Sequence, residues 1–141
     1  MLFYRIKAAF AEKAASFDVI TLHTSGMRHE QEDEIVYCDG KAEVSKYEIG
    51  HEKKRTLLKR AVCGADVVLK LLNDCGITAW DGFYGPHPKR VRDGTMFDFK
   101  ATVNGKKISA HGSQNFPPYY RDFRDGLYDI YEKYGVNIEN V

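Results

Sequence analysis

Short runs of apolar and β-branched residues, separated by polar turn signals, dominate the first half of the chain and predict β-strands. Two turn pairs divide these runs: Ser25-Gly26 ends the first, and Asp39-Gly40 favours a tight hairpin between the next two. A fourth run ends at the Cys63–Asp66 step, which we interpret as the start of a helix. The predicted strands are residues 17–24, 34–38 and 41–49, which form a meander, and residues 54–62, which would also fit a first helical turn but which we take as a fourth strand.

The acidic run Glu30–Glu34 precedes the second of these strands. It lacks the glycine and the alternation of a calcium loop. We therefore expect it to be a solvated hairpin flank that also blunts an exposed sheet edge.

A second hairpin is predicted later in the chain by a stricter alternation. Apolar residues from Phe97 to Val103 alternate with polar ones, and Asn104-Gly105 follows as a two-residue type I′ turn. Because such a turn determines the pairing behind it, the register of the return strand 106–111 can be written from the sequence. The expected pairs are Val103 with Lys106, Ala101 with Ile108, Phe99 with Ala110, and Asp98 with His111.

Two segments instead show the spacing of amphipathic helices. The first runs from Asp66, a favourable N-cap residue, to Gly76. The second is entered through Pro117-Pro118 and stops at Gly135. Gly126 weakens it by roughly 1 kcal/mol relative to Ala, so we expect that position to allow close packing of the helix on the sheet. The apolar residues of this helix are Tyr120, Phe123, Leu127, Ile130 and Tyr134.

Together these elements predict an α+β domain. We expect an antiparallel sheet of about five or six strands, built from a meander and a hairpin, with a short helix and a C-terminal helix packed on one face. A chain of 141 residues corresponds to one domain of ordinary size, so we assign residues 1–141 to a single domain. Residues 1–16 fit the beginning of a strand as well as a helix, and we treat them as an N-terminal extension.

Composition and charge exclude several classes of protein. The 21 basic and 20 acidic side chains leave a net charge of +1, too little to steer the chain to a polyanion. No apolar run reaches the roughly 20 residues of a membrane span. Arg5 and Lys7 interrupt the first apolar stretch, which is unlike a signal peptide. We therefore expect a cytoplasmic protein with no membrane partner.

The three cysteines, Cys38, Cys63 and Cys75, are odd in number and show no CxxC spacing, which favours free thiols in a reducing compartment. We expect all three to be buried or half-buried. The last two lie near the ends of the first helix, a position that would suit a lowered thiol pKa. The five histidines show neither HxH nor HExxH spacing. The sequence therefore predicts no metal site and no cofactor.

The segment 80–94 is the best candidate surface. It is rich in Gly and Pro but also aromatic, and long loops in compact domains are typically functional or locally packed. Pro86–Arg92 carries three cations and an imidazole on a backbone stiffened by two prolines, which suits a phosphate or carboxylate. A solvated charged face and a packed aromatic anchor are the simpler interpretations. The candidate ligand-binding residues are Trp80, Asp81, Tyr84, His87, Lys89, Arg90, Arg92, His111 and Asn115.

The expected pair of Asp98 with His111 is the clearest candidate for acid–base chemistry. A carboxylate opposite an imidazole can orient it as a general base, whereas the simpler interpretation is a solvated cross-strand pair. Ser113 is near in sequence, and we interpret it as a turn or capping residue. No serine or cysteine stands at a spacing that would complete a triad. We therefore assign no catalytic residue.

Six short motifs stand out: Leu71-Leu-Asn-Asp-Cys75, Trp80-Asp-Gly-Phe83, Gly85-Pro-His-Pro-Lys89, Asp93-Gly-Thr-Met-Phe97, Val103-Asn-Gly105 and Gly112-Ser-Gln-Asn-Phe-Pro117. On these motifs, about residues 17–134 resemble short bacterial domain proteins of uncharacterised function. The resemblance implies a single domain of bacterial origin, and it implies no activity and no functional residue.

Three classes of function remain, and we favour the first. It is a non-catalytic binding module for a protein, a peptide or a small anionic partner, which uses the 80–94 and 111–117 loops. The second is a small enzyme, which requires at least two acid–base residues to converge in one concave pocket. The third, single-stranded nucleic-acid binding, requires steep salt dependence and the aromatic and basic side chains of the 80–94 loop. The acid–base residues of the second class are Asp81, His87, Asp98 and His111.

Overall fold

The computed structural model describes residues 11–26, 29–89, 94–136 and 138. In these ranges the chain forms one seven-stranded sheet in the order β4-β3-β2-β1-β6-β7-β5, and all neighbouring strands are antiparallel except β5 and β7. The strands are β1 (Phe17–Gly26), β2 (His29–Cys38), β3 (Lys41–Ile49), β4 (Arg55–Gly64), β5 (Tyr84–Gly85), β6 (Met96–Val103) and β7 (Lys106–Ser113). The helices are α2 (Ala65–Asp74) and α3 (Tyr120–Tyr134), with short 3-10 turns η1 (His51–Lys53) and η2 (Ile77–Trp80).

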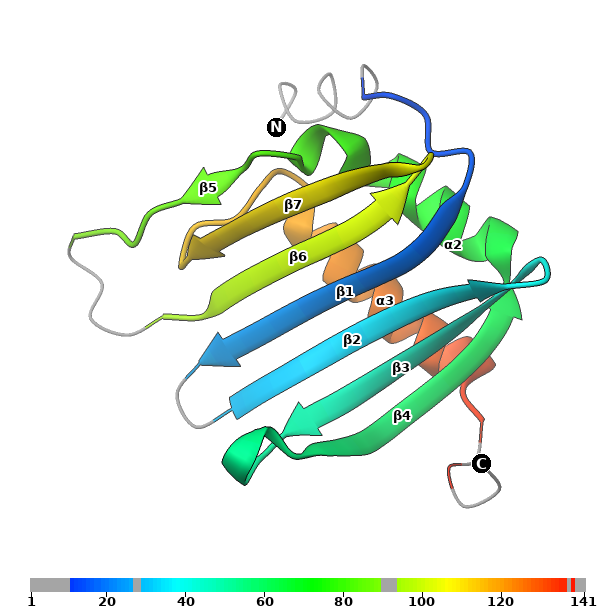
Figure 1. Ribbon diagram of the computed structural model, residues 1–141, viewed down its shortest axis with the longest axis horizontal. Coiled ribbons are helices and arrows are strands. Elements are labelled where there is room, and N and C mark those ends of the chain that lie inside the picture. The colour runs from blue at the N-terminus through cyan, green and yellow to red at the C-terminus, as the bar shows by residue number, and fades with distance from the viewer. Residues whose placement is uncertain (1–10, 27–28, 90–93, 137, 139–141) are drawn as a thin grey trace.

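Both helices lie on the same face of the sheet, and none of the described elements covers the other face (Figure 1). The alternation along the strands explains this arrangement. In β6, Phe97, Phe99 and Ala101 are buried, while Asp98 and Lys100 between them are exposed. The buried apolar residues of the described ranges form one cluster. The predicted α+β fold, with a short helix and a C-terminal helix on one face, is confirmed.

The second hairpin pairs as its turn predicts. Asn104 and Gly105 have φ values of 54° and 73°, the left-handed conformations that a type I′ turn requires. All four expected pairs, including Asp98 with His111, are present. The pairing of β6 with β7 is therefore determined locally.

The prediction for the acidic run Glu30–Glu34 is wrong. β2 begins at His29, so the whole run belongs to a strand that lies between β1 and β3 and not at an edge of the sheet. Neighbouring elements supply the cations that make this possible. Arg55 Nη2 lies 3.1 Å from Glu32 Oε2. The sheet also has seven strands instead of five or six, since the 80–94 loop contributes the short strand β5.

Asp33 is the one acidic residue of β2 that faces the helices, and it is only 4% exposed. Its carboxylate accepts a hydrogen bond of 2.7 Å from the Tyr131 hydroxyl on α3 and lies 3.1 Å from Lys46 Nζ on β3. Burial raises the pKa of Tyr131, and the negative charge of Asp33 raises it further. Tyr131 therefore stays protonated as the donor that ties α3 to the sheet.

Two details of the predicted helices require correction. The N-cap of α2 is Gly64, not Asp66, which lies in the first turn. Gly126 does allow a close approach, but a Cβ there would collide with Leu71 of α2 and not with the sheet. Gly76 is left-handed, with φ 61°, as predicted for the residue that follows a helix.

Part of the N-terminal extension is attached to the sheet. The side chain of Asn104 accepts hydrogen bonds of 2.8 and 3.1 Å from the amides of Ala15 and Ser16. Ala14 is buried, and its amide donates to the Asn73 side chain at 2.7 Å. Residues 1–10, for which the sequence left helix and strand open, lie outside the described residues.

The cysteines differ from expectation in two respects. Cys38 is exposed, whereas Cys63 and Cys75 are buried as predicted. Burial raises the pKa of both buried thiols, that of Cys75 to about 12. The suggestion of a lowered thiol pKa at the ends of α2 is therefore wrong, because desolvation disfavours the thiolate.

Trp80 anchors the start of the 80–94 loop in the core and is 2% exposed. Its ring lies edge-on to Phe99 of β6 and Phe123 of α3, with centroids 5.0 and 5.6 Å away. The indole Nε1 donates to the Pro118 carbonyl at 3.0 Å. The interpretation of this residue as a packed anchor is therefore supported.

We expect Trp80→Ala to lower the free energy of unfolding by about 3–5 kcal/mol, because it removes a large buried ring and leaves a cavity. Urea denaturation followed by circular dichroism would measure the change. Tyr84→Ala is the matched control from the same loop, since its side chain is 63% exposed; it should change stability by less than about 0.5 kcal/mol. Equal effects of the two substitutions would contradict the anchor role.

Candidate functional site

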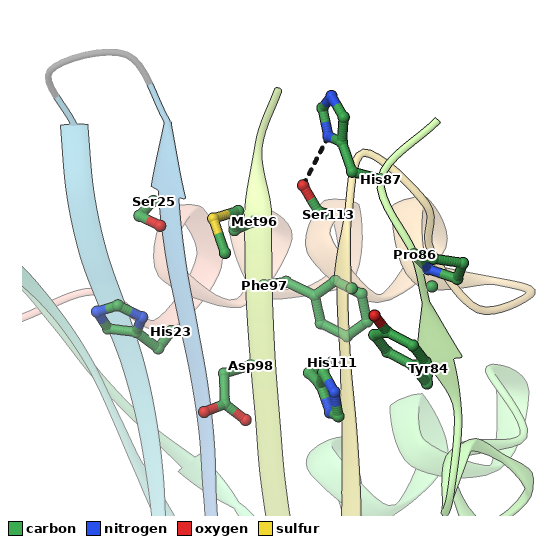
Figure 2. A pocket seen from close by; sticks show the side chains of 12 residues that line it. His23, Ser25, Tyr84, Pro86, His87, Met96, Phe97, Asp98, His111 and Ser113 are labelled. Atoms are coloured by element: carbon green, nitrogen blue, oxygen red, sulfur yellow. Dashed lines mark hydrogen bonds between the residues drawn. The ribbon is translucent and has the colours of Figure 1, made fainter. Parts of the chain in front are cut away.

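A pocket of about 610 Å³ opens on the uncovered face of the sheet, where β1, β6 and β7 approach β5 (Figure 2). We call it the histidine pocket. Three imidazoles, one carboxylate, two serine hydroxyls and the phenol of Tyr84 line it. The polar lining residues are His23, Ser25, His87, Asp98, His111 and Ser113, and the apolar part is formed by Tyr84, Pro86, Met96 and Phe97 together with Gly85 and Gly112.

Strand register explains why the central residues of this pocket meet. His23 of β1 pairs with Asp98 of β6, which pairs with His111 of β7, which pairs with Tyr84 of β5. Side chains at directly opposite positions point to the same face, with Cβ atoms about 5 Å apart. The rings of Tyr84 and His111 have centroids 4.9 Å apart. Four strands thus contribute one row of polar and aromatic side chains, which Figure 2 shows.

A carboxylate orients the His23 imidazole. Nε2 of His23 lies 2.6 Å from Glu30 Oε2, and the same carboxylate lies 3.0 Å from Lys53 Nζ on η1. Because an ionised carboxylate only accepts hydrogen bonds, Nε2 of the ring carries the proton, and Nδ1 is left to contact a ligand. The hydrogen bonds from Lys53 and His23 hold the pKa of Glu30 below its ordinary value of 4.5.

A second imidazole is paired at the outer end of the pocket. His87 Nδ1 lies 2.8 Å from Ser113 Oγ (Figure 2). Ser113 is the last residue of β7, so its interpretation as a turn or capping residue is wrong. Nearby, the Asn115 carbonyl packs closely on β5 and β7, which is possible because Gly85 and Gly112 have no Cβ that would collide with it.

The structure divides the predicted site residues into three groups. Tyr84, His87 and His111 line the histidine pocket. Trp80 is buried, Asp81 accepts a hydrogen bond from the Ser109 amide at 2.9 Å, and Lys89 and Asn115 are exposed and do not line this pocket. Arg90 and Arg92 lie outside the described residues. The aromatic and basic loop therefore contributes a short segment to the site and not its whole length.

Sequence reasoning missed the residues that β1 and β2 contribute. His23, Ser25 and Glu30 carry no local signal, since their relation to His111 depends on the pairing of β1 with β6. The alternation in 17–24 does place His23 on the polar face of its strand. The sequence thus indicates a histidine on a polar strand face and the Asp98–His111 pair. It does not show that the strand of His23 lies beside the strand of Asp98.

Comparison with known proteins adds no assignment: no protein-family model matches the chain, and no curated protein is significantly similar to it. Within the described ranges, no group of three or more His, Cys, Asp or Glu residues is arranged to hold a metal ion. None of the described helices is long and apolar enough to cross a membrane.

We expect Glu30→Gln to release His23 and to flatten the acid sensitivity of the fold. Since the folded-state pKa of Glu30 is lowered, its ionised form stabilises the protein above the ordinary value, and this contribution is lost as the pH falls through the folded pKa. Denaturation curves between pH 3 and 7 measure the slope, and ¹⁵N NMR of the imidazole reads the tautomer. Glu132→Gln, an exposed change on α3, is the control; identical slopes for both variants would contradict the pairing.

Proposed function

We propose that the protein is a non-catalytic binding module that holds a small anionic ligand in the histidine pocket. The observation that supports it best is the convergence of hydrogen-bonding side chains from four strands and a loop in one concave site. Three imidazoles and one carboxylate, Asp98, line the site, and imidazoles gain positive charge readily near neutral pH.

The charged residues around the histidine pocket also favour an anionic ligand. Glu30 and Glu32 of β2 lie beside His23; Lys53 lies 3.0 Å from Glu30, and Arg55 lies 3.1 Å from Glu32 and 3.9 Å from Glu34. These cations offset part of the negative charge of the three carboxylates before a ligand arrives.

The apolar wall of the pocket gives a place for the body of the ligand. Tyr84 and Met96 are exposed, with 63% and 55% of their surface accessible. Pro86 lines the pocket next to them. Exposed apolar groups beside convergent polar ones are typical of small-molecule sites.

A titration of ¹⁵N-labelled protein with phosphate, small carboxylates and nucleoside monophosphates at two salt concentrations tests this proposal. We expect localised shifts at His23, Tyr84 and His111, and we expect His111→Ala to weaken binding by about tenfold, the loss of one charge-assisted hydrogen bond. The control is His51→Ala, an exposed histidine on η1 outside this pocket. Shifts confined to other surfaces, or equal binding by both variants, would contradict the proposal.

An enzyme is the second candidate, because three of the four proposed acid–base residues, His87, Asp98 and His111, line one pocket. Asp81 does not, since its carboxylate binds the Ser109 amide. The orientation of His23 by Glu30 and the contact of His87 with Ser113 also suit general-base chemistry, such as the activation of a hydroxyl or a water.

If the site is catalytic, Asp98→Asn and Ser113→Ala should abolish turnover of small ester and phosphoester substrates but change their binding by less than about threefold. Product formation by the wild-type protein, followed by chromatography, is the measurement. Turnover that survives in both variants would show that the histidine pocket is not the catalytic site.

Single-stranded nucleic-acid binding receives less support. Of the three loop aromatics, Trp80 is buried, Phe83 is half-buried, and Tyr84 is the exposed one. A stacking platform needs several accessible rings. We therefore do not propose this function.

A further inference from the structure

A second and smaller pocket, of about 240 Å³, lies at the end of β1 and the start of β2, beside α3. We call it the Arg124 pocket. Its side chains are a guanidinium, an imidazole, an amide and three hydroxyls, and none of the lining residues is acidic. These side chains belong to Arg124, His29, Gln31, Thr24, Ser25 and Thr95.

The guanidinium of Arg124 has an unusual environment for a half-buried cation. Within the part of the chain that the structure describes, none of the ion pairs involves Arg124. Half-buried cations normally have an anionic partner, because partial burial weakens their hydration. The pocket therefore contains a positive charge for which the described chain supplies no counter-charge.

Tyr120, one helical turn before Arg124, is only 7% exposed and does not line the Arg124 pocket. Burial raises the pKa of Tyr120, while the charge of Arg124 and a hydrogen bond with it act in the opposite direction. The guanidinium thus has a neutral hydroxyl beside it, and this hydroxyl supplies no counter-charge.

The pocket is held by rigid elements. Thr24 is 7% exposed and pairs with Phe97 of β6, and Gln31 pairs with Glu48 of β3. The nearest buried acid, Asp33, is already bound by Lys46 at 3.1 Å. Glu48 is exposed. The acids that surround the pocket are thus compensated or solvated, and Arg124 dominates its interior.

We propose that the Arg124 pocket binds a small oxyanion, with inorganic phosphate or a terminal phosphomonoester as the fitting chemistry. The planar guanidinium can donate two parallel hydrogen bonds to such an anion, and the threonine and serine hydroxyls can donate to its remaining oxygens. This site is separate from the histidine pocket, because Thr24 and Gln31 face the helices while His23 faces the open side of the sheet. Ser25 lines both pockets.

The test is a titration of ¹⁵N-labelled protein with inorganic phosphate, glycerol phosphate and acetate at constant ionic strength. We expect saturable shifts at Thr24, Gln31 and Thr95 with both phosphates, and weaker shifts with acetate, which offers fewer acceptor oxygens. A larger affinity for glycerol phosphate than for inorganic phosphate would identify the phosphomonoester as the ligand, and the reverse order would identify the free anion.

Matched variants decide whether the shifts report this site. Arg124→Gln should weaken phosphate binding by tenfold or more, whereas Arg121→Gln, an exposed arginine on the same helix, should leave it unchanged. Gln31→Glu keeps Arg124 but adds a negative charge to the pocket, and it should weaken binding at least as much. His111→Ala should leave the phosphate-induced shifts at Thr24, Gln31 and Thr95 unchanged, which separates this site from the histidine pocket of the proposed function. Equal binding by the wild-type protein and Arg124→Gln, or no saturable shift at the pocket residues, would overturn the proposal.

Discussion

The pairing of β1 with β6 is the constraint on which the rest of the structure depends, because it joins the meander to the second hairpin in one sheet. The register places Leu22 opposite Phe99 on the helix side and His23 opposite Asp98 on the open side. A shift of one residue would turn every side chain of β1 to the other face. It would expose the core and remove His23 from the histidine pocket. Stability and the candidate site therefore depend on the same register.

The single-sided arrangement of the helices explains where chemistry can occur. α2 and α3 bury one face of the sheet, so polar side chains of β1, β6 and β7 collect on the other (Figure 1). At the edge of this face, β5 runs parallel to β7 and turns Tyr84 and His87 toward the strands. The start of the same loop is held by Trp80 in the core and by the Asp81 carboxylate on Ser109. A rigid scaffold thus presents a short functional segment.

Ion pairs stabilise the acidic strand β2, whereas some charged groups elsewhere have no ion pair and can contact a ligand. Glu30, Glu32 and Asp33 lie close together in β2, and each has a cation near its carboxylate. Asp98, between two histidines, and Arg124, on α3, have no ion pair within the described residues and line the two candidate pockets. Their positions on opposite faces at one end of β1 explain why two different pockets lie so close together.

The sequence by itself determined the features that depend on neighbours in the chain. The Asn104-Gly105 turn sets the register of β6 with β7, and the apolar spacing of 120–134 predicts α3, because a two-residue turn and a helical period act over a few residues. The register that this turn sets also predicts the Asp98–His111 pair. Local reasoning failed for the Glu30–Glu34 run, whose acidic side chains are paired with cations from β3, β4 and η1.

Tertiary structure alone decided which strands became neighbours. Alternation shows that a strand has an apolar and a polar face, but it does not show which strand lies beside it. His23 reached Asp98, and Ser113 reached His87, through contacts between segments that are distant in the chain. Arg124 likewise belongs to a pocket formed by β1, β2 and α3. These relations follow from how the apolar faces pack under the two helices, and this packing is a property of the whole fold.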